Sequence, residues 1–132
     1  MDEDILTKKI GNKEQKSLEA KPVVVLSVLI EPVKGKEGGK SAGKEVGKKL
    51  TILVKHPDKL EPVSLSSAVA IVGKSLKNSG LWLNLDDEGN LQKGSMIAML
   101  LQKYGCNTIK ELEGKTLQTE VDESKFLTIR AY

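Results

Sequence analysis

Residues 23–30 read Val23-Val-Val-Leu-Ser-Val-Leu-Ile30, and residues 50–54 read Leu50-Thr-Ile-Leu-Val54. β-Branched and leucine residues of this kind favour strands. Between them the chain reads Lys34-Gly-Lys-Glu-Gly-Gly-Lys-Ser-Ala-Gly-Lys-Glu-Val-Gly-Lys-Lys49, with six lysines and two glutamates. A glycine-rich backbone is costly to order and gives a core nothing to pack. The pattern predicts strands at about 22–33 and 49–55, joined by a mobile loop at 34–49.

Short apolar segments predict the remaining strands. Val63–Leu65 and 68–74 have strand composition, and Leu81-Trp-Leu-Asn-Leu-Asp86 alternates strictly between apolar and other residues. Strict alternation indicates a strand with one buried face, here the face of Leu81, Leu83 and Leu85. The last two strands are expected at 115–121 and 125–132, and their short connection favours a C-terminal hairpin.

The helix signals are concentrated between residues 95 and 114. Ser95 is a good N-cap for a helix over 96–104, and Gly105 is a good stop signal. Farther on, Thr108 and Glu111 have the spacing of a capping box, which opens a one-turn helix ending at Gly114. Lys93-Gly-Ser95 also places a lysine and backbone N–H groups at a helix start, a generic anion site, although an ordinary capped helix explains the same residues.

The order of these elements predicts a mainly β (α+β) fold. One helix between the third and fourth strands, followed by a β-hairpin, is the layout of a small OB-like β-barrel. Another compact β-barrel or an α+β sheet fits the alternation equally well. We expect residues 1–20 to be a flexible charged N-terminal tail and residues 21–132 to form a single domain.

Composition excludes several classes of function. The chain has 132 residues, a net charge of +3, one cysteine and one histidine. Cys106 alone cannot form an internal disulfide, and no cysteine-based zinc site is possible. The acids Asp86, Asp87 and Glu88 lack a neighbouring base or nucleophile. We therefore expect a cytoplasmic protein that is not an enzyme, with no cofactor, no metal, no signal peptide and no membrane segment.

The basic residues are unevenly distributed. The cluster at 34–49 suits a polyanion, because lysine ammonium groups are point charges that contact phosphates. Arg130 is the only arginine, and arginine is the usual reader of base edges, so sequence-specific recognition is not expected. The alternative is that the lysines only keep the loop soluble.

The few aromatic residues are expected on outward faces. Alternation turns Trp82 away from the leucine face of its segment, and in 126–132 it turns Phe126, Thr128, Arg130 and Tyr132 away from Leu127, Ile129 and Ala131. Exposed rings of this kind stack on nucleic-acid bases without sequence preference. The alternative is that Trp82 and Phe126 pack in a second small core.

The last third of the chain carries a resemblance. The segments Lys93-Gly-Ser95, Leu100-Leu101, Tyr104-Gly105, Glu111-Leu112 and Gly114-Lys115 resemble a pattern in small OB-fold, single-strand-binding proteins of phages and archaeal mobile elements. The resemblance implies non-catalytic binding of single-stranded nucleic acid. We expect DNA more than RNA as the ligand, although the sequence leaves the choice between them open.

The sequence thus predicts a non-specific single-strand binder. The rival hypothesis is an accessory subunit whose exposed aromatics bind a partner protein or a second copy of the chain. The predicted nucleic-acid-binding residues are Lys34, Lys36, Lys40, Lys44, Lys48, Lys49, Trp82, Phe126, Arg130 and Tyr132.

Overall fold

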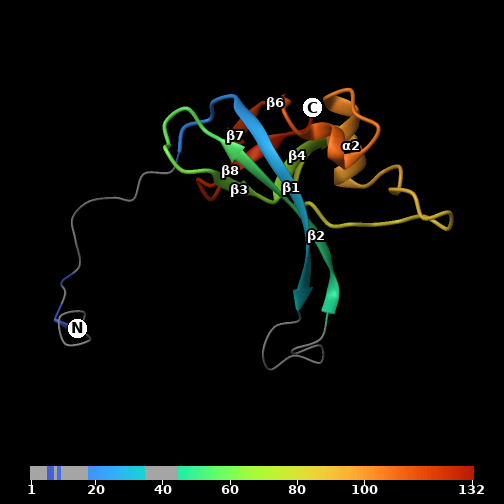
Figure 1. Ribbon diagram of the computed structural model, residues 1–132, viewed down its shortest axis with the longest axis horizontal. Coiled ribbons are helices and arrows are strands. Elements are labelled where there is room, and N and C mark those ends of the chain that lie inside the picture. The colour runs from blue at the N-terminus through green and yellow to red at the C-terminus, as the bar shows by residue number, and fades with distance from the viewer. Residues whose placement is uncertain (1–5, 8, 10–17, 35–44) are drawn as a thin grey trace.

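The computed structural model describes residues 6–7, 9, 18–34 and 45–132, which form two four-stranded sheets and a helix (Figure 1). The first sheet has the order β3-β2-β1-β6, and the second has the order β5-β4-β8-β7. The mainly β prediction is confirmed. In chain order the elements are β1 (Val23–Lys34), β2 (Glu45–Lys55), β3 (Val63–Leu65), β4 (Ser67–Val72), β5 (Ser75–Gly80), α2 (Met96–Lys103), the 3-10 helix η1 (Ile109–Leu112), β6 (Thr116–Leu117), β7 (Thr119–Val121) and β8 (Leu127–Arg130).

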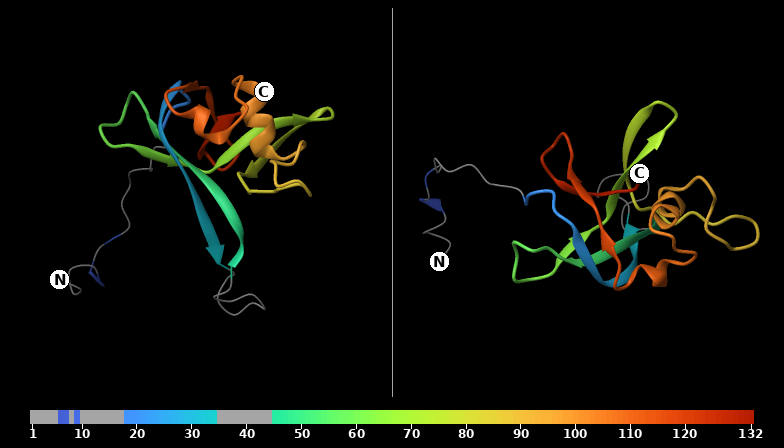
Figure 2. Two further views of the ribbon diagram at one scale, coloured as in Figure 1. Left: turned by 45° about the vertical axis from the view of Figure 1, so that its right-hand side comes forward. Right: turned by 90° about the horizontal axis from the view of Figure 1, so that it is seen from above.

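Strands β1 and β2 form a long antiparallel ribbon that extends well beyond the rest of the fold (Figures 1 and 2). The pairing runs from Val24 opposite Lys55 to Lys34 opposite Glu45. Residues 45–48, which the sequence assigns to the loop, therefore lie in β2, where Glu45, Gly47 and Lys48 pair with β1. A ladder needs only a backbone N–H and C=O from each residue, so lysine and glycine continue it once the neighbouring residues are paired. The connection 35–44 lies outside the described residues.

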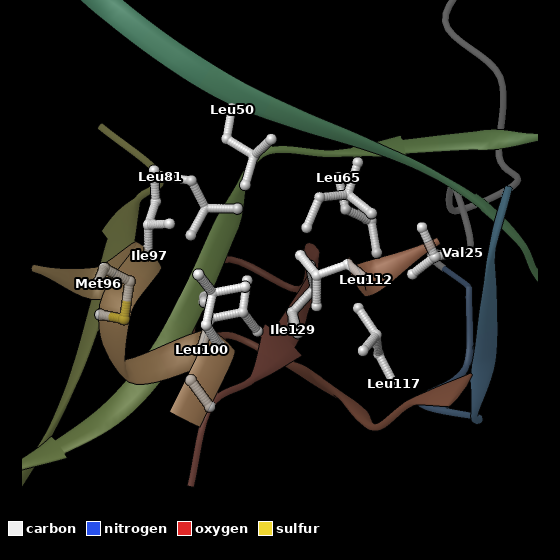
Figure 3. Packing of buried hydrophobic residues seen from close by; sticks show 14 of the residues in the cluster. Val25, Leu50, Leu65, Leu81, Met96, Ile97, Leu100, Leu112, Leu117 and Ile129 are labelled. Atoms are coloured by element: carbon white, nitrogen blue, oxygen red, sulfur yellow. The ribbon is translucent and has the colours of Figure 1, made fainter. Parts of the chain in front are cut away.

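The core lies where the two sheets and α2 meet (Figure 3). Leu50, Ile52 and Val54 of β2 are fully buried, which confirms that they share the inner face of their strand. Figure 3 shows Leu50 facing a layer of side chains that includes Leu100 of α2 and Ile129 of β8. Side chains from distant segments thus fill one core.

Both helix ends match the sequence signals. The Ser95 hydroxyl accepts a hydrogen bond from the backbone N–H of Ala98, so Ser95 caps α2 as predicted. Gly105 follows the helix with φ +69°, a conformation in which glycine carries no penalty. Thr108 and Glu111 form the predicted capping box of η1.

Two predictions about the strands are wrong. Residues 81–86 form only isolated bridges, and Leu85 is 53% exposed rather than in the core. The strand in this region is β5, which the polar sequence of residues 75–80 did not predict. It forms because Gly73, with φ +63°, allows a tight turn after β4. The turn brings Ser75 opposite Val72, so β5 pairs with β4 in an antiparallel hairpin.

The outward position predicted for Thr128 is also wrong. Its side chain is fully buried, and its hydroxyl lies 2.9 Å from the hydroxyl of Ser67 and 3.3 Å from the amide oxygen of Asn78. A central strand has neighbours on both edges, and these polar partners replace the water that an outward Thr128 would contact.

The Tyr104 hydroxyl connects the end of α2 to two strands. It accepts a hydrogen bond from the backbone N–H of Gln118 (2.8 Å) and donates one to the carbonyl of Arg130 (2.7 Å). Burial raises the pKa of the Tyr104 phenol above its ordinary value. Because the folded protein holds this proton more tightly, the contribution to stability is complete below the ordinary pKa near 10 and is lost as pH rises through the raised value.

We therefore expect Tyr104→Phe to lower the free energy of unfolding at pH 7 by about 1 kcal/mol. The wild type is expected to lose stability above pH 10, where the Tyr104 phenol ionises, and Tyr104→Phe should abolish this loss. Urea unfolding at both pH values measures each effect. An equal loss of stability in the variant at high pH would mean that another group is responsible.

Candidate functional site

Trp82 lies in a short segment, residues 81–83, that pairs with β2 although it belongs to none of the four strands of the first sheet. The N–H of Leu50 donates to the carbonyl of Leu81, and the N–H of Leu83 donates to the carbonyl of Lys48, both at 2.8 Å. These bonds place Trp82 opposite Lys49 of β2. Leu81 is fully buried and Trp82 is 37% exposed, so the indole lies on the face away from the core.

Lys49 and Trp82 form a pair on that face. The ammonium nitrogen of Lys49 is 5.4 Å from the centroid of the indole ring, which is within the range of a cation–π interaction. The pair therefore places a positive charge beside an aromatic surface. Nucleotides present the complementary groups, a phosphate next to a flat base.

A shallow groove of about 250 Å³ lies beside the indole. On one side it is lined by the β4–β5 hairpin, and on the other by the start of α2. Its chemistry combines an ammonium group, an amide, two hydroxyls and apolar side chains. The lining residues are Val72, Lys77, Ser79, Gly80, Trp82, Asn84, Gly94, Ser95, Met96 and Met99. We call this feature, together with Lys49, the Trp82 groove.

Two groove residues show what sequence reasoning missed. Lys77 was missed because it lies on β5, a strand that the sequence did not predict. Asn84 could have been found from the sequence, because the alternation of residues 81–86 places it on the same side as Trp82. Ser95, which was considered as part of an anion site, lines the groove while capping the helix.

Three of the lysines predicted to bind nucleic acid, Lys34, Lys48 and Lys49, lie on the β1–β2 ribbon. Lys48 is exposed on β2 next to Lys49, and Lys34 is exposed at the end of β1. Three others, Lys36, Lys40 and Lys44, lie outside the described residues.

The predicted C-terminal site residues lie apart from Trp82. Arg130 is exposed, and its guanidinium is 4.5 Å from the ring centroid of Tyr132. Arg130 is paired with Val69, which is itself paired with Asn78, so these residues share one face of the second sheet. Lys77, the neighbour of Asn78, lies on the other face and lines the Trp82 groove. The sequence therefore predicts one binding surface, whereas in the structure Trp82 and Arg130 lie on two different surfaces.

Phe126 is 70% exposed and follows the turn between β7 and β8. Its backbone N–H donates to the side chain of Asp122, which also accepts the N–H of Ser124. This turn holds Phe126 outward, away from the core.

Other chemically capable residues have structural partners. His56 is fully buried, and its Nε2 atom lies 2.8 Å from the carbonyl oxygen of Glu19. Its Nδ1 atom accepts a hydrogen bond from the backbone N–H of Asp58. Cys106 is buried. Across the described residues, no group of three or more histidine, cysteine, aspartate or glutamate side chains is arranged to hold a metal ion. In the same part of the chain, no helix has the length and apolar character needed to cross a membrane.

Comparison with known proteins identified no relative. No family model matches the chain, and searches of curated proteins and of solved structures gave no significant match.

Proposed function

We propose that this protein binds single-stranded nucleic acid without sequence specificity and without catalysis. The observation that carries the proposal is the pairing of Lys49 with the partly exposed indole of Trp82 at the edge of a groove that also contains Lys77. A base would stack on the indole, while its phosphates would contact the two ammonium groups. DNA is the proposed ligand, and the cytoplasm is the proposed location.

The geometry favours single strands over duplexes. Stacking on an aromatic side chain requires a base whose face is free, and in a duplex both faces are covered by neighbouring base pairs. With lysine supplying nearly all of the positive charge, the contacts to the backbone are independent of sequence. The mainly β architecture with one helix is compatible with an OB-like barrel, which we keep as part of the proposal.

The predicted binding residues lie on the two sides of the β4–β5 hairpin, and we expect the two groups to contribute different amounts to affinity. In this proposal the Trp82 groove supplies most of the affinity. Phe126, Arg130 and Tyr132 are secondary contacts, reached by a strand that continues past the hairpin. Lys34 and Lys48 extend the positive surface along the β1–β2 ribbon, and the lysines at 36, 40 and 44 are proposed as further phosphate contacts.

The salt dependence of binding tests this proposal. Each phosphate contact contributes about −0.7 to the slope of log K against log salt for single strands. We expect the triple variant Lys48→Ala, Lys49→Ala, Lys77→Ala to reduce the magnitude of the slope by about 2, because it removes the two phosphate contacts of the groove and the neighbouring contact of Lys48 on the ribbon. The measurement is a fluorescence anisotropy titration with a labelled oligothymidine at four salt concentrations.

A variant with the same charge change is the control. Lys59, Lys103 and Lys115 are exposed and none of them lines the groove. Replacing all three by alanine should leave the slope close to that of the wild type. Equal reductions in both variants would mean that overall charge, not the groove, attracts the ligand. A wild type that fails to bind at low salt would refute the proposal.

The rival function, docking of a partner protein, is favoured by one specific feature. Ile71 and Leu76 are directly opposite each other on β4 and β5, and they are 53% and 58% exposed. Adjacent exposed apolar side chains are typical of interaction surfaces. Binding through this pair would be nearly independent of salt, so the same titration series separates the two functions.

A further inference from the structure

Gly47 lies close to the six-membered ring of the Trp82 indole. A Cβ atom built on Gly47 would be 3.1 Å from Cζ3 and 3.2 Å from Cε3 of the ring. Both distances are shorter than ordinary carbon–carbon contacts of about 3.5–4.0 Å. The ring therefore packs closely against β2, and a side chain at position 47 would have to push it away by a few tenths of an ångström.

Gly80 has the same relation to Lys49. A Cβ atom on Gly80 would be 2.5 Å from Cε and 2.8 Å from Nζ of Lys49, and 3.3 Å from Nε1 of Trp82. The end of the lysine side chain thus occupies the space that a side chain at position 80 would fill. Two glycines from different strands border the same pair of groups.

Backbone conformation does not explain either glycine. Neither Gly47 nor Gly80 has a positive φ, whereas Gly73, Gly89, Gly105 and Gly114 do. Glycine within a strand lowers stability because it loses more conformational freedom on folding than other residues. Glycine in a strand often marks a place where another group approaches closely. At both positions that group belongs to the Lys49–Trp82 pair.

We infer that Gly47 and Gly80 are positioning residues that hold Trp82 and Lys49 in their binding arrangement before the ligand arrives. This inference rests on the proposed function. Side chains that are already ordered lose less entropy on binding, so preorganisation increases affinity without adding a contact to the ligand. The glycines act through Trp82 and Lys49 and need not touch the nucleic acid.

Alanine substitutions test the inference, because Trp82 is the only tryptophan and reports its own surroundings. Gly47→Ala should lift the ring from β2, which shifts its emission to longer wavelength and increases quenching by acrylamide. Gly80→Ala should displace the end of Lys49. We expect each variant to bind a labelled oligothymidine about fivefold more weakly, the factor that corresponds to the lower limit for one stacked base.

Gly94→Ala is the matched control. Gly94 also lines the groove, but a Cβ atom there would meet nothing within 4 Å, and its φ is not positive. This variant should keep the emission of the wild type, because its Cβ atom meets neither Trp82 nor Lys49. Thermal melts of all three variants measure any loss of folding. If Gly47→Ala destabilises the protein, Gly80→Ala decides, because its Cβ displaces the flexible end of a lysine.

The outcomes separate this inference from the proposed function. If both variants keep the emission and affinity of the wild type while Trp82→Ala weakens binding, the glycines do not position the pair, and the proposed function stands. If the wild type does not bind the oligonucleotide, the proposed function fails, and the positioning role fails with it even where the emission shifts.

Discussion

Ile129→Ala is expected to lower the free energy of unfolding by about 2–5 kcal/mol, the range for truncation of a buried isoleucine. Ile129 is fully buried on β8 and packs in the core between the sheets and α2 (Figure 3). Its neighbours come from several elements, so they cannot all move inward to fill the cavity that alanine leaves. Urea unfolding followed by circular dichroism measures the change.

Ile71 provides the matched comparison, because it is the same residue type with 53% of its surface exposed. Ile71→Ala should change stability by no more than about 0.5 kcal/mol. Phe126→Ala should be similarly benign, since Phe126 is 70% exposed. If Ile129→Ala is harmless and Phe126→Ala unfolds the domain, Phe126 and not Ile129 faces the core.

Trp82→Ala is expected to weaken binding of single-stranded DNA by about 1–3 kcal/mol, which is a factor of roughly five to one hundred and fifty. The loss follows from removing the aromatic surface next to Lys49, where a base is proposed to stack. Anisotropy titration with a labelled oligothymidine gives the affinity. A thermal melt shows whether the variant is folded at the titration temperature.

Two variants sharpen this experiment. Trp82→Phe keeps a stacking ring and should recover part of the affinity. Phe126→Ala removes an exposed ring outside the groove and should cost less than Trp82→Ala. If Phe126→Ala costs more, the main contact lies near the β7–β8 turn and not in the Trp82 groove.

Sequence signals that act over a few residues predicted their structures well. Ser95 caps α2, and Glu111 completes the capping box of η1, because each needs only a backbone N–H three residues away. The buried face of Leu50, Ile52 and Val54 was likewise predictable, since alternation along one strand is a local pattern.

Properties that depend on distant partners were not predictable. The alternation of residues 81–86 indicates a strand, but Leu85 pairs with Leu91 in an isolated bridge, and its side chain finds no core. Thr128 is buried because Ser67 and Asn78 lie beside it, which no pattern near residue 128 shows.

In the candidate site, too, the features set by local sequence were predictable and those set by distant partners were not. The outward direction of Trp82 follows from alternation with Leu81, and its exposure agrees with that direction. Its pairing with Lys49 does not follow, because it depends on how segment 81–83 lies against β2. The separation of Trp82 from Arg130 depends on the second sheet, which joins β4 to β8.

The position of β8 also affects the order of folding. β8 lies between β4 and β7, and it is parallel to β4, with Ser67 and Thr128 in contact across 61 residues of sequence. Contacts between residues so far apart form slowly, because a long loop must close before any of them is gained. The β1–β2 hairpin closes a much shorter loop, so we expect it to form earlier. Until β8 arrives, β4 has an unpaired edge, and aggregation is most probable during that interval.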